Sequence, residues 1–364
     1  MGVSRPSTTD PVAAGGAGAA VGHLSDRSPQ LGATELAERL RPPRRFGTVG
    51  FDTFVPNPDH PSQAAASQEM QSLVAEVSAA STPARRRWGR PRPEADRSAP
   101  GRYLDGGFGV GKTHLLAAAW HAAPAPKAYL SFAELTAIIG FVGMDQAVRA
   151  FSGYRLLCID EFELDDVANT LMTVTFLRGV IPAGVRVAAT SNSLPDRLGE
   201  GRFSAEDFRR EIAAIASWFD VVRMDGPDYR AAGRPPMTAA LSEHAVDLLV
   251  AQSAGNVTDD AFAPLLHHLR RVHPVQYGPL VEATDVAVVR GLSPLTEQGP
   301  ALAWVGLIDK LYDAEVVFGA TGCDVADLFD PSFRQGGYRK KYGRCESRLA
   351  AMLGEAGHRL AGPR

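Results

Sequence analysis

Cysteine is scarce in this chain, and its copies lie far apart. The 364 residues contain three cysteines, at positions 158, 323 and 345, and none forms a C-x-x-C pair or another spacing typical of metal ligands. This pattern excludes a small disulfide-stapled domain and predicts a reduced, cytoplasmic protein. Cys158 lies in an apolar run and is expected to fill space in the core.

Long apolar runs and an excess of positive charge are also missing. No stretch approaches the ~18 residues that span a bilayer, and the N-terminus has no apolar signal core, so we expect no transmembrane segment. The formal net charge at pH 7 is −3, so the chain as a whole offers no basic surplus that would attract nucleic acid.

One glycine-rich segment carries a specific chemistry. Residues 106–113 have the sequence GGFGVGKT, which fits the phosphate-binding pattern G-x-x-x-x-G-K-[ST]. A strand is expected to end at Tyr103-Leu104, and a helix is expected to begin at His114. In that arrangement the loop's backbone N–H groups face phosphate, and the helix dipole adds positive potential at the same point.

The residues of this loop have distinct expected roles. Lys112 reaches the β- and γ-phosphates of ATP, and the Thr113 hydroxyl binds Mg²⁺. A glycine-rich turn before an ordinary amphipathic helix could have the same sequence. The assignment of a phosphate-binding loop therefore depends on further site residues elsewhere in the chain. The expected nucleotide contacts are Gly106, Gly107, Phe108, Gly109, Val110, Gly111, Lys112, Thr113 and His114.

Two adjacent carboxylates are the first of these further residues. Asp160-Glu161 follow the apolar run 156–159, which is typical of a buried parallel strand. Charges after a buried strand are costly unless they lie at the carboxyl edge of the sheet, where open α/β sheets bind ligands. We therefore expect Asp160 to bind Mg²⁺ together with Thr113, and Glu161 to orient and polarise the attacking water.

A third strand end carries a polar side chain. Residues 185–190 are expected to form a strand that is followed by Ser191-Asn192. Taken alone, Asn192 would be an ordinary turn residue. Its place at the next strand end after Asp160-Glu161 favours a side chain that senses the γ-phosphate or the lytic water.

Composition divides the chain into three parts. Residues 1–30 are rich in Gly, Ala, Ser and Pro and are predicted to form a disordered tail. Residues 31–233 alternate strand and helix patterns, interrupted by a basic, proline-rich loop at 81–100. Residues 234–364 form a smaller C-terminal lobe, with helices expected at 242–252, 259–272 and 300–313 and strands at 285–290 and 316–318. The predicted fold class is α/β, a P-loop NTPase whose parallel sheet is flanked by helices.

Two features allow more than one interpretation. Phe46, Phe51 and Phe54 precede the P-loop strand and pack either over the adenine or simply on the core. The basic segment 85–97 binds a polyanion or an acidic partner, or it forms solvated surface, which is the commoner outcome for such runs. The segment 334–348 is also basic, and the two segments are the only support for binding to DNA.

Several segments together resemble one family. They are YLDGGFGVGKT at 103–113, LCIDEF at 157–162, TSN at 190–192, DGPDYR at 225–230, LIDKLYD at 307–313 and the upstream HPSQ at 60–63. Over about residues 31–353 the chain is similar to the ZapE and Afg-type AAA+ ATPases, in an actinobacterial form. Many ATPases share the P-loop and the Asp-Glu pair, so these two motifs do not distinguish one ATPase family from another. The D-G-x-D-Y-R and I-D-x-L-Y-D segments are the ones that favour the ZapE and Afg-type family.

This resemblance implies a AAA+ fold, hydrolysis of Mg-ATP and assembly into a homo-oligomeric ring with ATP. It implies a protein client in cell division, with the tubulin-like protein FtsZ as the candidate and peripheral association at the division site. The mitochondrial relatives are linked to protein quality control.

A DNA-associated ATPase, such as a helicase loader or an initiator-like protein, is the alternative, although no helix-turn-helix or zinc motif supports nucleic-acid binding. A small-molecule kinase is a weaker interpretation, because Glu161 suits activation of water.

The chain departs from the family pattern in two places. Between residues 122 and 151 it lacks an H-F-H-x-F-M-like sequence, and LGEGRF at 198–203 replaces L-Q-R-x-x-F. Arg202, followed by Phe203, is similar to the arginine that ring ATPases place at the subunit boundary, where it stabilises charge on a neighbour's γ-phosphate. Arg209 and Arg210 compete for this role, and an ordinary surface arginine is the third interpretation.

Overall fold

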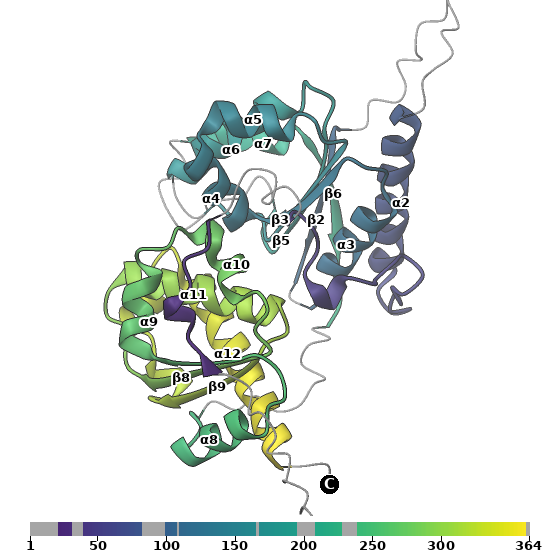
Figure 1. The fold of residues 1–364 in the computed structure, drawn as a ribbon. Helices are drawn as coiled ribbons and strands as arrows, with labels where there is room; N and C mark the ends of the chain where they lie inside the picture. The colour runs from purple at the N-terminus through teal and green to yellow at the C-terminus, as the bar shows by residue number, and fades with distance from the viewer. Residues whose placement is uncertain are drawn as a thin grey trace, which may run out of the picture.

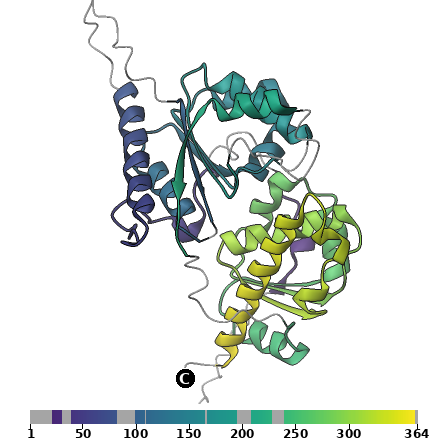
Figure 2. The same cartoon turned by 180° about the vertical axis from the view of Figure 1, so that it is seen from behind.

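Two parallel sheets organise the chain into two lobes, seen from opposite sides in Figures 1 and 2. The computed structural model describes residues 21–30, 39–81, 99–107, 109–164, 167–194, 208–227 and 239–361. Over these ranges no helix combines the length and the apolar character needed to cross a membrane.

The core lobe is built on a five-stranded sheet. Its strands follow the spatial order β3-β4-β5-β2-β6, and all of them are parallel, so the α/β class predicted from the sequence is confirmed. Because the strands are parallel, their carboxyl ends meet at one edge, where such folds bind ligands. The strands are β2 (Gly101–Gly106), β3 (Lys127–Ser131), β4 (Leu156–Asp160), β5 (Arg186–Ser191) and β6 (Phe219–Met224).

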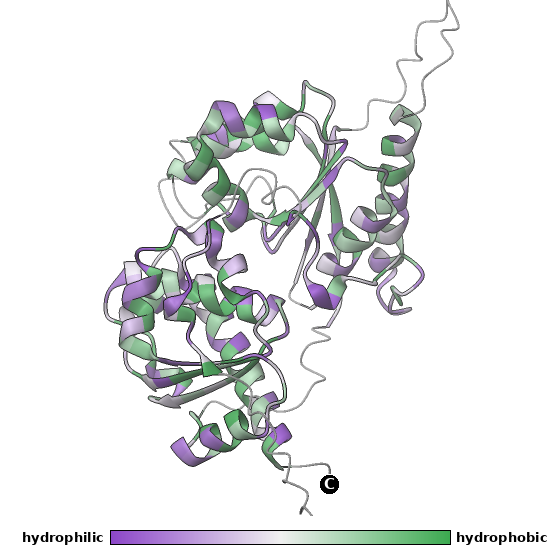
Figure 3. Cartoon of the chain, viewed as in Figure 1, coloured by the Kyte–Doolittle hydropathy of each residue, from purple (hydrophilic) through white to green (hydrophobic). Residues whose placement is uncertain are grey.

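Helices cover both faces of this sheet, and the core strands carry mostly hydrophobic colour in Figure 3. α2 (Pro61–Ser81) and α3 (Lys112–Ala122) pack on the face that receives Leu156 and Cys158, which is fully buried as expected. The other face receives Leu157 and Ile159, so β4 is apolar on both sides. That face is covered by α4 (Phe132–Val142), α5 (Met144–Phe151), α6 (Val167–Val180) and α7 (Arg209–Ala216).

The C-terminal lobe has a second parallel sheet, of order β1-β7-β8-β9. The strands expected near 285–290 and 316–318 are β8 (Val286–Leu292) and β9 (Val317–Gly322). The expected helix at 259–272 is wrong at its start: β7 (Val257–Ala261) continues through residue 261, because it pairs with β8 inside the sheet. The helices of this lobe are α8 (Glu243–Ala251), α9 (Phe262–Leu269), α10 (Tyr277–Val281), α11 (Gln298–Asp313) and α12 (Arg339–Ala361).

The first strand of that sheet comes from the start of the chain, the purple segment that crosses the C-terminal lobe in Figure 1. β1 (Val21–Gly22) pairs with β7, and the Leu24 side chain is fully buried in the core of this lobe. The buried Asp260 carboxylate accepts hydrogen bonds from the backbone N–H groups of Leu24 (2.8 Å) and Ser25 (3.0 Å). The predicted disordered tail is therefore wrong for residues 21–30, which these contacts fix; residues 1–20 lie outside the described ranges.

Removal of residues 1–30 should destabilise the C-terminal lobe. It deletes β1, the buried Leu24 side chain and the backbone donors to Asp260, and it deletes Arg27, whose Nη1 lies 2.8 Å from the Leu280 carbonyl. Exposing one leucine costs roughly 1.5–3 kcal/mol, and the carboxylate left without its donors adds to this cost. We expect a melting temperature lower by about 5 °C or more.

The matched control for this deletion is a chain that lacks only residues 1–20. Its composition predicts little buried apolar surface, so it should melt like the full chain. Thermal unfolding of the two truncated proteins is the measurement, and equal melting temperatures would contradict the structural role of residues 21–30.

Candidate nucleotide site

The order of the core strands gathers three predicted strand ends. β5 lies between β2 and β4, so Asn192, which follows β5, lies between the glycine-rich loop and Asp160. The Lys112 Nζ atom donates to Asn192 Oδ1 at 2.9 Å, and the Thr113 hydroxyl donates to Asp160 Oδ1 at 3.3 Å. The structure therefore brings together residues that the sequence assigned separately to the loop, the carboxylate pair and the third strand end.

Close packing explains two glycines of the loop. Gly111 has a φ of +98° at the N-cap of α3, and a Cβ atom there would lie 2.6 Å from the Phe54 ring. A Cβ atom on Gly106 would lie 2.2 Å from the Met224 carbonyl oxygen. With glycine at both positions the chain can turn tightly into α3, which places the first amides of this helix at the carboxyl edge of the sheet. Phe108 lies outside the described ranges.

Lys112 is held across the mouth of the loop. Its side chain is buried, and Nζ donates to the carbonyl oxygens of Gly106 (2.8 Å) and Gly107 (2.5 Å) as well as to Asn192. Phosphate oxygens are stronger acceptors than these neutral carbonyl and amide groups, because a charged acceptor strengthens the hydrogen bond. The ammonium group is thus positioned to bind phosphate at this edge.

Asp160 is fixed by neighbours on both flanking strands. Its Oδ2 atom accepts from the Tyr129 hydroxyl at 2.9 Å, and its Oδ1 atom accepts from the Thr190 hydroxyl. Burial, reinforced by the Asp160 charge, raises the pKa of Tyr129 well above its ordinary value, so this hydroxyl stays a donor. Sequence reasoning missed both residues, although hydroxyl side chains near the ends of strands expected beside β4 were the available signal.

Thr113 and Asp160 form a donor set that fits Mg²⁺. They offer two hard oxygen atoms, 3.3 Å apart, at the loop that would bind the phosphates. Mg²⁺ is usually held by one or two protein groups together with phosphate oxygens and waters. Within the described ranges no group of three or more His, Cys, Asp or Glu side chains offers another metal site.

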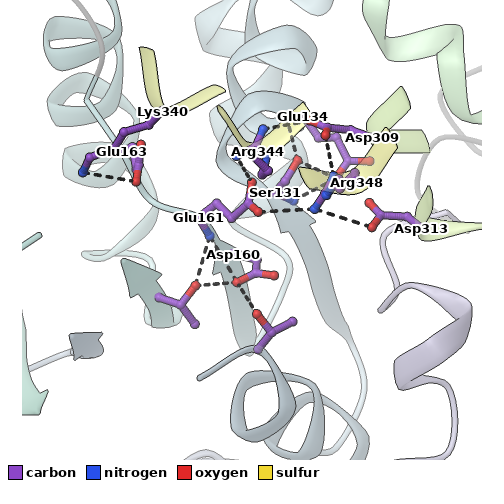
Figure 4. A network of polar contacts seen from close by, with 12 residues as sticks. Ser131, Glu134, Asp160, Glu161, Glu163, Asp309, Asp313, Lys340, Arg344 and Arg348 are labelled. Carbon is purple, nitrogen blue, oxygen red and sulfur yellow. Dashed lines mark hydrogen bonds and ion pairs between the residues drawn. The ribbon is translucent and has the colours of Figure 1, made fainter. Parts of the chain in front are cut away.

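Glu161 contacts the C-terminal lobe (Figure 4). Its backbone has a φ of +55°, and its N–H donates to the Thr190 hydroxyl at 3.0 Å. The carboxylate pairs with Arg344 Nη1 at 2.5 Å and with Arg348 Nη2 at 3.4 Å, both on α12. Burial between the lobes raises the pKa of Glu161, and the two guanidinium charges oppose this rise. The basic character of segment 334–348 did not predict these ion pairs with Glu161.

The segment 307–313, which narrowed the family resemblance, lies at this contact between the lobes. Leu307, Ile308 and Leu311 are buried in the C-terminal lobe. Two polar residues of the segment contact the core lobe: Lys310 pairs with Glu134 of α4, and Asp313 pairs with Arg45 at 3.4 Å. A cavity of about 290 Å³ lies between the lobes and has Asp160 and Glu161 in its lining.

Two other family segments bind each other beside the glycine-rich loop. In the HPSQ segment, Gln63 Nε2 donates to the Asp225 carbonyl at 3.0 Å, and the Ser62 hydroxyl accepts from the Asp225 N–H at 2.9 Å. A Cβ atom on Gly226 would lie 2.4 Å from Gln63 Nε2, which explains glycine at that position. Residues 228–230 of the DGPDYR segment lie outside the described ranges.

The structure describes the phenylalanines that precede the P-loop strand and two of the three arginines considered for the subunit boundary. Phe46, Phe51 and Phe54 pack partly buried on the core, and the Phe54 ring lies 5.5 Å from the His114 ring; contact with adenine stays a prediction. Arg209 and Arg210 are exposed at the start of α7. Arg202 falls within 195–207, outside the described ranges.

Comparison with known proteins identifies the family. A family profile described as AFG1-like ATPase matches residues 33–247, which is more than half of the chain. The chain belongs to the AFG1-like ATPase family. The family resemblance is thereby confirmed, and the expected enzyme class, ATPase, is the one that this family's description gives.

Individual relatives match over shorter stretches. The cell division protein ZapE of Escherichia coli (strain K12) is 30% identical over 155 residues, which are 39% of this chain and 41% of that protein. The lactation elevated protein 1 homolog B of Danio rerio is 32% identical over 76 residues, 21% of this chain and 15% of that protein. The alignment with ZapE thus spans about two fifths of its length.

Solved structures resemble the chain weakly. Domain III of the Thermotoga maritima replication initiation protein DnaA has a TM-score of 0.37 at 15% identity and covers 55% of this chain and 79% of that one. The DnaC helicase loader has a TM-score of 0.35 at 16% identity, over 50% of this chain and 99% of that one. These scores are too low to support a functional argument.

Proposed function

We propose that this member of the family binds Mg-ATP at the 106–114 loop, hydrolyses it to ADP and phosphate, and uses the cycle to act on a protein partner. The observation that carries the proposal is the convergence of Lys112, the Thr113–Asp160 pair and Asn192 at one sheet edge. Glu161 directly follows Asp160 at that edge and supplies a carboxylate suited to water activation.

Each side chain has one task in this arrangement. The loop amides and Lys112 bind the phosphates, and Thr113 and Asp160 hold Mg²⁺, which neutralises charge on the β- and γ-phosphates when bound. Asn192 contacts the γ-phosphate or the lytic water. Glu161 orients that water and accepts its proton. Tyr129 and Thr190 hold Asp160 in position through their hydroxyl groups.

Hydrolysis should depend on Mg²⁺ through Thr113. Phosphate release from ATP is expected to stop in excess EDTA, because the charge on the γ-phosphate is then not neutralised. Thr113→Ala should raise the Mg²⁺ concentration for half-maximal rate by about tenfold or more. Thr175→Ala on α6, whose hydroxyl donates to a backbone carbonyl of its own helix, is the matched control. A rate that is indifferent to EDTA would disprove the metal assignment.

The proposed partner is a protein of cell division in the cytoplasm, with FtsZ as the candidate. The similarity to the cell division protein ZapE supports division as the process. Glu161→Gln protein with ATP should retain the nucleotide-bound state and co-sediment with FtsZ polymers, while the same protein with ADP should not. Co-sedimentation that does not depend on the nucleotide would count against a client that is engaged through the ATP cycle.

The DNA-associated alternative rests on two basic segments, of which 85–97 lies outside the described ranges and 334–348 is described. In the basic segment 334–348, Arg344 and Arg348 pair with Glu161 and Asp309, and Lys340 lies 3.7 Å from Glu163. A carboxylate that pairs with such a cation offsets its positive charge and occupies its hydrogen-bond donors, so the pair attracts a DNA phosphate only weakly. DNA binding that weakens steeply with salt would revive this alternative.

Ring assembly and an arginine finger at Arg202 are part of the proposal. Arg202→Ala should then preserve ATP binding and lower turnover by roughly 10³-fold or more, because an arginine finger stabilises transition-state charge on a neighbour's ATP. Mixing Arg202→Ala subunits with Lys112→Ala subunits should restore part of the activity, because an intact finger then meets an intact loop across some interfaces. Crosslinking must show that mixed assemblies form. Full activity of Arg202→Ala alone would rule the finger out.

A further inference from the structure

The hydrolytic carboxylate is bound by the lobe that does not contain the phosphate-binding loop (Figure 4). Arg344 Nη1 lies 2.5 Å from Glu161 Oε2, and Arg348 Nη2 lies 3.4 Å from Oε1, so each oxygen faces a different guanidinium. The two arginines are four residues apart on α12, which places them on one face of that helix. Arg348 and Glu161 are 187 positions apart in sequence, and the contact requires the two lobes to be docked.

The arginines are themselves fixed by their own lobe. Asp309 on α11 pairs with Arg344 Nη2 at 2.7 Å and with Arg348 Nη1 at 2.5 Å. The Arg348 guanidinium also lies over the Tyr312 ring, 4.9 Å from its centroid. The side chains of Arg344 and Arg348 are 19% and 10% exposed, so they move with the lobe instead of swinging freely in solvent. We call Arg344, Arg348 and Asp309 the arginine clamp.

The clamp changes what Glu161 can do. A water-orienting carboxylate must direct a lone pair at the lytic water, whereas here two cationic donors share its oxygens and α12 sets its direction. The clamp is also not a fully satisfied ion network, because the buried Arg344 Nε atom has no hydrogen-bond partner among the residues that the structure describes. Incompletely satisfied buried charges are costly for stability, so such a contact suits an interaction that is made and broken.

We propose that the arginine clamp restrains Glu161 and keeps ATP turnover slow while the lobes are docked, and that displacement of the C-terminal lobe releases the hydrolytic carboxylate. The inference rests on the proposed function, because it concerns the residue assigned to orient the lytic water. The position of the C-terminal lobe thereby regulates the nucleotide site.

Arg344→Gln tests the clamp directly. Glutamine keeps a polar group beside Asp309, which Arg348 still neutralises, but it removes the closer of the two charges that hold Glu161. We expect kcat for ATP to rise about threefold to tenfold, since a clamped fraction near nine-tenths would limit the rate to roughly a tenth of the unclamped value. The KM for ATP should stay within about twofold, because the phosphate-binding loop is unchanged.

Three further variants test whether a rise in kcat comes from release of Glu161. Arg359→Gln is the same change on the same helix at a residue that pairs with Glu355 of α12, and it should leave kcat unchanged. Arg344→Lys keeps a positive charge and should return kcat toward the wild-type value. Adding Glu161→Gln to Arg344→Gln should cancel the rise, because the released carboxylate is then absent.

A variant on the core lobe tests the same idea without altering α12. Glu134→Gln removes the ion pair with Lys310 that docks the lobes and should also raise kcat, by about threefold. A kcat at or below the wild-type value in Arg344→Gln would overturn the clamp. If Arg344→Gln fails to fold, a kcat at or below the wild-type value in Glu134→Gln would overturn it instead. A wild-type protein that hydrolyses no Mg-ATP would instead overturn the proposed function, so the two failures are distinguishable.

Discussion

Glu161→Gln should lower steady-state ATP turnover by roughly two orders of magnitude or more while leaving nucleotide binding close to that of the wild type. Glutamine keeps the size and hydrogen-bonding capacity of the side chain but cannot accept the proton of the attacking water, and loss of such a group costs about 10²–10⁴-fold. The backbone hydrogen bond from residue 161 to Thr190 does not depend on this side chain, so the strand end should keep its geometry.

Two assays on one preparation check this result: phosphate release at saturating Mg-ATP, and equilibrium binding of a fluorescent ATP analogue. Glu355→Gln is the matched control, because it makes the same change at an exposed residue whose partner Arg359 lies in the same helix. A normal rate of phosphate release by Glu161→Gln would show that another group orients the water.

Lys112→Ala should weaken ATP binding itself. The ammonium group lies at the mouth of the loop, 2.8 Å from the Gly106 carbonyl and 2.9 Å from Asn192 Oδ1, where it can exchange these neutral acceptors for phosphate oxygens. Hydrogen bonds to charged groups contribute about 1.5–3 kcal/mol each, so loss of one or two should raise the Kd by between roughly tenfold and roughly 10⁴-fold.

The control for Lys112→Ala is Lys341→Ala on α12, which removes a lysine of the other lobe whose ammonium lies over the Tyr338 ring. Calorimetric titration with ATP and Mg²⁺ measures the effect, and thermal unfolding checks that the variant is folded, because Lys112 is buried. Unchanged affinity in a folded Lys112→Ala protein would remove the loop from the nucleotide site.

The convergence of Lys112, Thr113, Asp160 and Asn192 at one sheet edge could be predicted because its signals are local. Asp160 and Asn192 each follow an apolar run that is too short for a helix, and polar residues at such points indicate the carboxyl edge of a parallel sheet. Parallel order then brings them beside the glycine-rich loop, as the contacts of Lys112 and Thr113 show.

The contacts with the C-terminal lobe could not be predicted, because they join segments that are far apart in sequence. Leu24 shows no periodic pattern with its neighbours, and its burial depends on pairing of β1 with a strand more than 200 residues later. Arg344 and Arg348 belong to a run of basic residues, whose commonest fate is solvated surface. Their carboxylate partners become apparent only when α11, α12 and the end of β4 are placed together.

A structure of the Glu161→Gln protein bound to Mg-ATP would show whether the glycine-rich loop and the ends of β4 and β5 hold the nucleotide. We expect the γ-phosphate within hydrogen-bonding distance of Lys112 Nζ and Asn192, with Mg²⁺ between the Thr113 hydroxyl and Asp160. Lys112 should have exchanged the Gly106 and Gly107 carbonyl oxygens for phosphate oxygens. Nucleotide bound elsewhere, with Lys112 still on those carbonyl groups, would disprove the assignment of this site.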